Sequence, residues 1–445
     1  MVRRIEPRVE ERTARGIAVA IGSLISDGAL EPGDKLPTVR ALASELGVSV
    51  NTVSDAWRIL QSHGVIVTER RRGTTVRSTR AGLGGRYWQV PVEPGTIELD
   101  LSTGTPDNEL LPPIGPVLHH LHADVTVSSY VDPPLVVELE EELRRRWPFD
   151  PAAVTVVDGA QDALDRAVLE LVNLGDTVIV EDPTFPPLID MLELAGARIV
   201  GVPLDDEGPS LDPLAAAMST SPVAIFTQPR AHNPTGVHIS ADRTRAIADL
   251  VAGTRTVVVE DDHSGPAAGV ALESVGAFVP DNVLHIHSFS KSHGPDLRIA
   301  AIGGPAEVVA NIVRRRQLGP SWTSRLIQQI LLTMLTDPAT EDLVASAAGC
   351  YRRRRAELGA LLATHGVHVT PGAGLNMWIP VGDEQRTVVA LAAHGIGVAP
   401  GQPFRVNASD QHHVRLSVGA LRGDLSEIAE TIAAAAGDGH SSVVS

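Results

Sequence analysis

Lysine is nearly absent from this sequence. Lys35 and Lys291 are the only two among 445 residues, against 35 arginines. A guanidinium stays protonated in proteins, whereas an ammonium can lose its proton and attack a carbonyl carbon to form a Schiff base. Because arginine cannot perform that chemistry, a chain that uses arginine for almost every other cation has a chemical reason to keep Lys291.

Lys291 lies in the run Ser-Phe-Ser-Lys-Ser at residues 288–292, directly after the strand-like residues 283–287. The hydroxyls of Ser288 and Ser290 and the guanidinium of Arg298 could hold a phosphate beside its amine. One alternative is a surface lysine in a Ser/Gly loop. Another, a nucleophilic Ser288 with Lys291 as its base, requires a Lys-Thr-Gly element, and neither lysine is followed by Thr-Gly.

Cysteine and long apolar runs are also scarce. The single Cys350 excludes a disulfide framework within the chain and is typical of a reducing compartment. No apolar run reaches the length that spans a membrane, and the charged N-terminus lacks the apolar core of a signal peptide. We therefore expect a soluble, cytoplasmic protein without a membrane partner, with room for two or three domains.

Positive charge is concentrated at one end of the chain. Residues 1–80 hold 13 Lys and Arg against 9 Asp and Glu, a net charge of +4, and the remainder holds 24 against 45, a net charge of −21. A basic first part on an acidic remainder indicates two separate tasks, of which contact with nucleic acid would belong to the first part.

The first 77 residues, which we call the head, have a helix-turn-helix pattern followed by a hairpin. Apolar residues recur at helical spacing over residues 8–27. Thr38 can cap a second helix that ends at Gly47, and Ser49 begins a third. Two β-like runs, 65–67 and 74–76, flank an arginine-rich tip suited to phosphates or a minor groove. We favour DNA binding over a small helical bundle whose arginines are merely solvated.

The head resembles the winged helix of GntR-type bacterial regulators in Gly-Asp-Lys-Leu-Pro-Thr-x-Arg-x-Leu-Ala at residues 33–43 and Leu-Gly-Val-Ser-x-Asn-Thr-Val at 46–53. Val50 replaces the Arg that usually follows the Ser in that family, so the operator sequence is not inferred by analogy. The resemblance implies that the residues facing double-stranded operator DNA are Arg40, Ser49, Asn51, Thr52, Arg70, Arg71 and Arg72.

Three further segments follow the head. Residues 78–98 are rich in Gly and Pro and are expected to be a linker. In residues 99–436, which we call the body, strand-like and helix-like runs alternate in an α/β doubly wound pattern. Ligands bind off the carboxyl ends of the strands in such folds. Residues 437–445 are expected to be a disordered tail.

Four features of the body follow strand-like runs and could serve a cofactor. Gly159 and Ala160 open a helix whose amides would attract a phosphate. Phe185 could stack on a flat ring, Asn233 could reach a ring hydroxyl, and a carboxylate in residues 260–262 could hold a protonated ring nitrogen. Taken singly, each has a structural explanation at least as good; in this order, with Lys291 downstream, they describe one site for pyridoxal 5′-phosphate.

The order and spacing of these residues resemble the fold type I aminotransferases over most of the body. The resemblance implies Lys291 as the Schiff-base and catalytic lysine, Asp261 on the ring nitrogen, and Asn233 on the 3-hydroxyl oxygen. Arg415 would clamp a substrate carboxylate. Because no Arg accompanies Phe185 to hold a second anionic group, we expect a ligand with one carboxylate and an apolar or small remainder. The other cofactor contacts that it implies are Gly159, Ala160, Phe185, His263 (where the family usually has Tyr), Ser288, Ser290, Arg298 and, in a homodimer, Tyr130 reaching the neighbour's phosphate.

A GntR-type head before an aminotransferase-like body resembles the MocR subfamily of regulators. This implies a transcription regulator that senses an amino compound, or pyridoxal phosphate itself, through an aldimine at Lys291. The alternative is a working aminotransferase with an appended DNA-binding head, since transamination needs the same residues. We expect no metal site at His119, His120 and His122. The arginines of 314–316 and 352–355 are expected on solvated helix faces.

Overall fold

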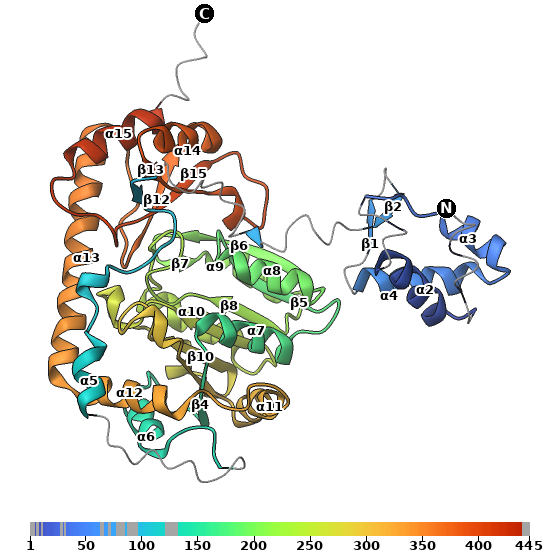
Figure 1. Cartoon of the computed structure of the whole chain (residues 1–445), viewed down its shortest axis with the longest axis horizontal. Coiled ribbons are helices and arrows are strands. Elements are labelled where there is room, and N and C mark those ends of the chain that lie inside the picture. The colour runs from blue at the N-terminus through green and yellow to red at the C-terminus, as the bar shows by residue number, and fades with distance from the viewer. Residues whose placement is uncertain are drawn as a thin grey trace, which may run out of the picture. The chain divides into compact units, whose positions relative to one another are not determined.

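The structure, a computed structural model, describes residues 12–26, 33–62, 66–69, 73–76, 85–86, 97–120 and 132–437, together with Ile5, Val9 and Leu30. The chain forms two compact units, residues 1–89 with 193–196 and the remaining residues, each described below by itself (Figure 1). Among the described residues, no helix has the length and apolar character needed to cross a membrane.

The described part of the head has three helices and one hairpin. The Thr38 hydroxyl accepts a hydrogen bond from the Ala41 amide at 3.2 Å, and Gly47 ends the second helix with a φ of +63°. Both predicted boundaries are confirmed, because a side-chain cap starts this helix and a left-handed residue stops it. The elements are α2 (Ala14–Ser26), α3 (Val39–Leu46), α4 (Val50–Ser62), β1 (Ile66–Glu69) and β2 (Gly73–Val76).

An apolar cluster holds the three helices of the head together. Ile17 and Ile21 of α2, Leu42 of α3, and Val53 and Trp57 of α4 are all buried in it. The side chains of α4 that the sequence predicted for one buried face therefore meet the core. This packing leaves the other face of α4 toward solvent, where Asn51 is exposed.

The body is built on an eight-stranded mixed sheet in the order β4-β11-β10-β9-β8-β5-β6-β7. The strands β10, β9, β8, β5 and β6 are parallel neighbours, so their carboxyl ends meet at one edge. Only β11, between β10 and β4, and the short β7 run against them. The strands are β4 (Ala153–Val157), β5 (Thr177–Asp182), β6 (Arg198–Asp205), β7 (Gly208–Pro209), β8 (Ala224–Thr227), β9 (Val257–Asp262), β10 (Val283–Ser288) and β11 (Ala300–Gly304).

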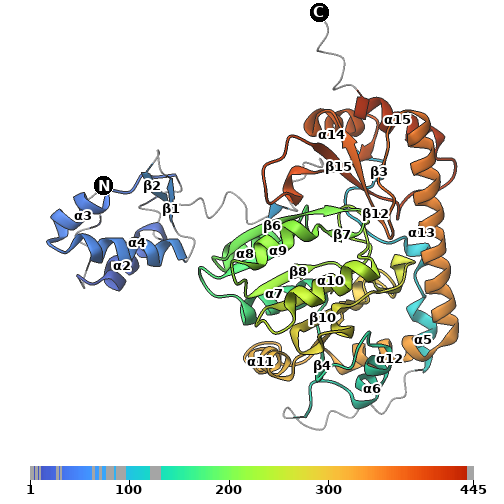
Figure 2. The same ribbon diagram turned by 180° about the vertical axis from the view of Figure 1, so that it is seen from behind.

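Helices cover both faces of this sheet (Figures 1 and 2). Near β4, α7 packs with α11, while α6 and α12 enclose a second cluster that includes Val154 and Val156. A third cluster, under α9 and α10, buries Val258 of β9. The helices are α5 (Ile114–His120), α6 (Val137–Arg146), α7 (Ala160–Leu171), α8 (Pro186–Leu194), α9 (Leu211–Met218), α10 (Ala241–Val251), α11 (Ala306–Arg316) and α12 (Arg325–Thr336).

A smaller sheet completes the body. Figure 1 shows α13 running along the body from the level of α12 to that of α15. The strand β15 carries Arg415 and pairs with β12 and β14, while β13 pairs with β3. The elements are β3 (Leu99–Asp100), α13 (Pro338–Thr364), β12 (Asn376–Val381), α14 (Glu384–Ala393), β13 (Ile396–Gly397), β14 (Ala399–Pro400), β15 (His412–Ser417) and α15 (Ser426–Gly437).

The prediction that the two arginine runs are solvated is wrong for two of their members. Arg316 is 2% exposed and donates hydrogen bonds to the Val156 carbonyl and to Asp158. Arg355 is 6% exposed and donates to the Asn376 carbonyl. Both guanidiniums tie segments that are distant in sequence, because one planar cation can satisfy several buried oxygens at once.

Candidate functional site

Predicted site residues stand at the ends of two neighbouring parallel strands. Asp261 is the register partner of Ile286, and Ser288 ends β10, three residues before Lys291. Side chains alternate along a strand, so Asp261 and Ser288 face one side of the sheet, whereas Asp262 faces the other. The side that Asp261 faces is called the front of the sheet below, and the opposite side the back.

Asp261 is buried without a counter-charge of its own. Its Oδ1 has no hydrogen-bond partner within the described part of the chain, and the side chain is 6% exposed. Burial, and then the nearby carboxylates of Asp262 and Glu181, raise the pKa of Asp261 to about 8. A buried carboxyl in this state is costly unless it meets a donor. A protonated ring nitrogen would supply one.

The surroundings of Lys291 favour the unprotonated form of its amine. Its Nζ donates a hydrogen bond to the Gly104 carbonyl at 2.6 Å. Burial, and then the charge of Arg415, lower the pKa of Lys291 to about 8. An amine with this pKa is partly unprotonated near neutral pH and can attack an aldehyde carbon.

Arg415 is the most deeply placed cation near Lys291. It is 1% exposed on β15 and donates to the Oδ1 atoms of Asn233 and Asn376 at 3.4 Å each and to the Ser102 carbonyl. A Cβ on Gly104, whose φ is +63°, would lie 3.0 Å from Arg415 Nη1. The structure therefore brings the predicted amine, guanidinium and amide together around Gly104.

A second group of residues, called the cradle below, brings together hydrogen-bond donors that could hold an anion. Gly159 has a φ of +98° and caps α7 without a side-chain hydrogen bond, so the first amides of the helix are available. A Cβ at Gly159 would lie 2.9 Å from Arg298 Nη2, which donates to the Asp158 carbonyl at 3.3 Å. Arg298 is exposed, and Ala160 begins the helix beside it. These donors match the chemistry of a phosphate.

The serines near Lys291 differ in their surroundings. Ser288 is 2% exposed, and its Oγ accepts a hydrogen bond from the Ser290 amide at 3.3 Å. Ser290 is half-buried at the turn that leads to Lys291. The Ser288 hydroxyl keeps its own proton for a further acceptor, as a phosphate contact requires.

His263 follows the end of β9, and Phe185 follows the end of β5. The Nε2 of His263 lies 3.0 Å from the Ala231 carbonyl, and Ser264 Oγ lies 3.2 Å from its Nδ1. Burial, and then the charge of Lys291, lower the pKa of His263 to about 4, so the ring is neutral. Phe185 is half-buried in the loop between β5 and α8.

The head presents its predicted DNA-facing residues on two helices. Arg40 is exposed on α3, and Asn51 is exposed in the first turn of α4. Ser49 Oγ accepts from the Thr52 amide at 3.0 Å and lies 2.9 Å from Thr52 Oγ1. Ser49 therefore caps the helix that would enter a major groove, by accepting from the Thr52 amide, and Asn51 stays available for a base edge.

Several predictions lie outside the described residues. These are Tyr130, the wing arginines Arg70, Arg71 and Arg72, most of the linker, and the tail beyond Gly437.

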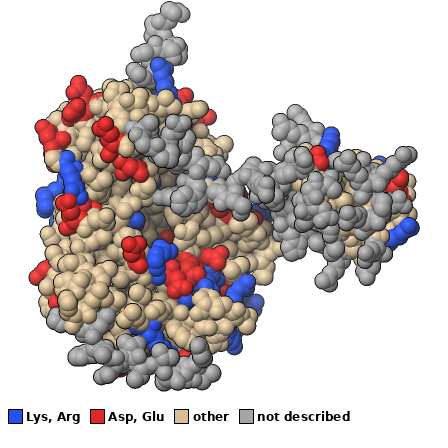
Figure 3. Space-filling view, in the orientation of Figure 1, with Lys and Arg blue, Asp and Glu red and all other residues tan. Residues whose placement is uncertain are grey.

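On the face of the body seen in Figure 3, acidic and basic side chains are interspersed.

Sequence reasoning missed a polar group on the back of the sheet. Arg230 donates a hydrogen bond to each carboxylate oxygen of Asp262, at 2.8 and 2.7 Å. His287 Nδ1 lies 3.0 Å from Asp262 Oδ2. Burial alone would raise the pKa of Asp262, but these hydrogen bonds hold it well below its usual range. The doubled acidic residues at 261 and 262 on one strand were the available signal, because such neighbours must face opposite sides.

Asp262, His285 and His287 bring three possible metal-ligating atoms within 4.8 Å of one another. Most of the polar atoms of these three side chains have a protein partner, although His285 Nε2 is buried without one among the described residues. Both Asp262 oxygens are held by Arg230, and His285 Nδ1 lies 2.8 Å from Glu260 Oε2. The group is therefore explained as a network of ion pairs and hydrogen bonds.

The fold and site together define a winged-helix protein with an aminotransferase-like body. The family model described as aminotransferase class I and II matches residues 96–432, and that of bacterial regulatory proteins, gntR family, matches residues 13–76. The chain belongs to the MocR-type regulators, in which a GntR-family head precedes an aminotransferase class I and II domain. It is thus a transcriptional regulator with an aminotransferase-like domain.

Relatives of known sequence share both parts of the chain. The vitamin B6 salvage pathway transcriptional repressor PtsJ of Salmonella typhimurium is 34% identical over 93% of this chain and 96% of its own length. The HTH-type transcriptional regulator TauR of Rhodobacter capsulatus is 27% identical, over 85% of this chain and 87% of its own.

Solved structures match the body. Kynurenine aminotransferase of Pyrococcus horikoshii superposes with a TM-score of 0.69 at 22% identity, covering 77% of this chain and 90% of that enzyme. Aspartate aminotransferase of Thermus thermophilus with maleate gives 0.68 at 24% identity, over 76% and 92%. These likenesses show that the body has the fold type I aminotransferase fold.

The residues present fit the cofactor of this family, pyridoxal 5′-phosphate. The Asp261 carboxyl, whose Oδ1 has no partner among the described residues, suits a pyridinium nitrogen. Lys291, with its lowered pKa, suits an aldehyde. The amides behind Gly159, with Arg298, suit a phosphate. Family and donor set therefore agree on this cofactor.

Proposed function

We propose that this protein binds operator DNA through its head and senses a small amino compound in its body with pyridoxal 5′-phosphate at Lys291. The observation that carries the proposal is the pairing of a GntR-family head with a body in which both Lys291 and Asp261 have shifted pKa values of about 8. Pyridoxal phosphate supplies an aldehyde that a lysine or an incoming amine can hold as an imine.

The residues around the amine restrict the effector. Arg415 is buried, and its donors already point at the oxygens of Asn233 and Asn376, which a carboxylate could join or displace. One guanidinium recognises one carboxylate best, by a bidentate contact. We therefore propose an effector with one carboxylate and an apolar or small remainder.

The roles of the other site residues belong to the same proposal. Lys291 holds the aldehyde, Asp261 the ring nitrogen and Asn233 the ring hydroxyl, with His263 beside them. Gly159, Ala160, Ser288, Ser290 and Arg298 hold the phosphate, and Phe185 stacks on the ring. Tyr130 would reach the phosphate of a second copy, so we propose a homodimer. Because a DNA-binding regulator of the gntR family acts where its operator DNA is, we propose a cytoplasmic location.

An effector can alter DNA binding only if it binds two states of the protein unequally. The test is a titration of the cofactor-loaded protein with each amino acid. Visible absorbance and the affinity for an operator selected from random DNA are followed together. The proposal requires one compound that changes both signals, and it fails if every compound that changes the absorbance leaves DNA affinity unaltered.

The same inventory of residues supports a second candidate, a working aminotransferase. Lys291, with its pKa lowered to about 8, and the buried guanidinium of Arg415 are also what transamination needs. This candidate requires multiple turnovers with a keto-acid acceptor, whether or not DNA is present.

A third possibility is that pyridoxal phosphate is itself the effector. It predicts that loading the cofactor changes operator affinity without any amino compound.

A further inference from the structure

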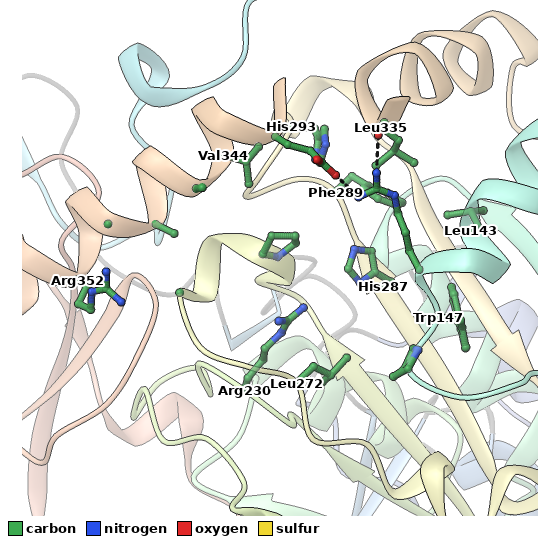
Figure 4. A pocket seen from close by; sticks show the side chains of 18 residues that line it. Leu143, Trp147, Arg230, Leu272, His287, Phe289, His293, Leu335, Val344 and Arg352 are labelled. Carbon is green, nitrogen blue, oxygen red and sulfur yellow. Dashed lines mark hydrogen bonds and ion pairs between the residues drawn. The ribbon is translucent and has the colours of Figure 1, made fainter. Parts of the chain in front are cut away.

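A cavity of about 720 Å³ lies on the back of the central sheet (Figure 4). Its walls come from the end of α6, from α12 and α13, and from the segments that follow β9 and β10. His287 and Arg230, which hold Asp262, line it. The cavity is therefore separate from the cofactor site on the front.

The cavity wall is mostly apolar. Leu143, Trp147, Phe289, Leu335 and Val344 line it, and all but Trp147 are at most 5% exposed. Figure 4 shows these side chains arranged around the opening, with the imidazoles of His287 and His293 among them. An apolar wall of this size, with a few convergent polar groups, is typical of a site for a small organic ligand.

Of the cationic side chains that line the cavity, one has no carboxylate partner among the described residues. Arg230 is neutralised by Asp262. Arg146 is paired with Glu341 at 2.7 Å and with Glu142, whose carboxylate it shares with Arg145. Arg352 on α13 is exposed and lines the cavity, and within the described part of the chain it makes no ion pair or hydrogen bond. A ligand that balances these charges carries one negative charge, placed at the Arg352 end.

The two imidazoles define the other polar contacts. His287 uses its Nδ1 for Asp262, and His293 uses its Nδ1 for Ser292 Oγ at 2.8 Å. Among the described residues, the hydrogen bonds of both rings run through Nδ1 and none involves Nε2. Because the Asp262 carboxylate can only accept, His287 Nδ1 carries the proton, and its Nε2 presents a lone pair to the cavity.

We infer that this cavity is a second ligand site, which takes a small monocarboxylate with a flat or branched apolar body. Its carboxylate meets Arg352, and its body fills the wall between Trp147 and Val344. The site goes beyond the proposed function, because it lies apart from Lys291 and needs no amine.

Occupation of the cavity is coupled to the cofactor site through short segments. Asp262 directly follows Asp261 in the sequence, and His287 directly precedes Ser288. Phe289 and His293 flank Lys291 on either side by two residues. A ligand that moves Arg230 or His287 changes the surroundings of Asp262, and with them the position of the strand that carries Asp261.

The experiment uses the full chain loaded with pyridoxal phosphate and the probe naphthalene-2-carboxylate, followed by calorimetric titration. We expect one probe molecule per chain, and markedly weaker binding of the uncharged naphthalene-2-carboxamide. Absence of saturable binding of the carboxylate overturns the inference. Equal affinity for the carboxylate and the amide overturns the assignment of an anionic ligand.

Two matched pairs of variants locate the probe. Arg352→Ala should weaken binding about three- to tenfold, as expected for a partly solvated ion pair, whereas Arg353→Ala, its exposed neighbour outside the wall, should not. Ala345→Trp should fill the cavity and abolish binding, whereas Ser346→Trp, the next residue outside the wall, should keep it. Equal effects within either pair would overturn the location.

A final control separates this cavity from the cofactor site. Arg415 could also attract a carboxylate, so the titration is repeated with Arg415→Ala. Binding that persists in Arg415→Ala supports the second site. Binding that is lost in Arg415→Ala and kept in Ala345→Trp would place the probe at the front of the sheet and overturn the inference.

Discussion

Asp261 and Asp262 are neighbours on β9, yet their carboxyl groups are in opposite states. Asp261 Oδ1 has no partner among the described residues, and the pKa of Asp261 is raised to about 8. Asp262 is clamped by Arg230 and His287, which hold its pKa well below the usual range. One strand thus carries a carboxyl that lacks a hydrogen-bond partner on the front of the sheet, and a carboxylate with several hydrogen bonds on the back of the sheet.

Asp261→Asn should change how the stability of the cofactor-free protein depends on pH. The folded-state pKa of Asp261, about 8, lies above its unfolded value of 3.8, so ionisation penalises the folded state as pH rises from about 4 to about 8. The penalty grows by up to about 1.4 kcal/mol per pH unit. Urea unfolding should therefore show that the free energy of unfolding of Asp261→Asn rises relative to that of the wild type as the pH increases from about 4 to about 8.

Asp262→Asn is the matched control, with the opposite sign. Because the folded-state pKa of Asp262 is depressed, its contribution is present above the unfolded value and lost as the pH falls. This variant should be less stable than the wild type at neutral pH, since Arg230 loses its partner in a buried site. Parallel stability profiles for wild type and Asp261→Asn would contradict the assignment of Asp261.

Gly159→Ala should weaken binding of pyridoxal phosphate. The new Cβ would lie 2.9 Å from Arg298 Nη2 and would displace the guanidinium from the cradle. Gly175→Ala is the control, because Gly175 also has a positive φ (+87°) but nothing within 4 Å of its Cβ position. Both variants should lose about 1 kcal/mol of stability from backbone strain. Only Gly159→Ala should show reduced affinity in a cofactor titration, and equal affinities would argue against the cradle.

Arg415→Ala should weaken the response to a carboxylate-bearing effector about ten- to a hundredfold. A charge-assisted contact of a buried guanidinium contributes roughly 1.5–3 kcal/mol. Cofactor loading at Lys291 should persist, measured by visible absorbance, and so should the response to an amine without a carboxylate. An effector that proves to be glutamate or aspartate, or an unchanged response, would refute the role given to Arg415.

Two variants of the head should separate base contacts from phosphate contacts. Asn51→Ala, on the exposed side of α4, should cost roughly 1–3 kcal/mol at one operator position and little elsewhere. Arg71→Ala should lower affinity for all sequences and reduce the slope of affinity against salt by about one. If Asn51→Ala weakened cognate and random DNA equally, Asn51 would contact the backbone instead.

The sequence predicted those parts of the molecule that short-range rules determine. The cap at Thr38, the left-handed Gly47 and the sequence of alternating strands and helices follow from local residue preferences. Lys291 was recognisable because its chemistry excludes arginine. These inferences needed no knowledge of contacts between distant segments.

The parts that could not be predicted depend on such distant contacts. Arg316 is buried because the Val156 carbonyl, 160 residues earlier in the chain, accepts its hydrogen bond. The antiparallel β11 between β10 and β4 leaves no periodic trace that distinguishes it from a parallel strand. The split between Asp261 and Asp262 required the partner Arg230, whose position only the fold determines.

The most direct test of the central claim follows the cofactor and DNA binding in one sample. Wild-type protein loaded with pyridoxal phosphate and bound to fluorescent operator is titrated with the effector found by the amino-acid screen. The account predicts that visible absorbance and operator affinity change with a common midpoint, and that both changes vanish in Lys291→Arg, which keeps the charge but cannot form the imine. A wild-type protein that stays colourless after incubation with pyridoxal phosphate, or a DNA response that survives in Lys291→Arg, would contradict it.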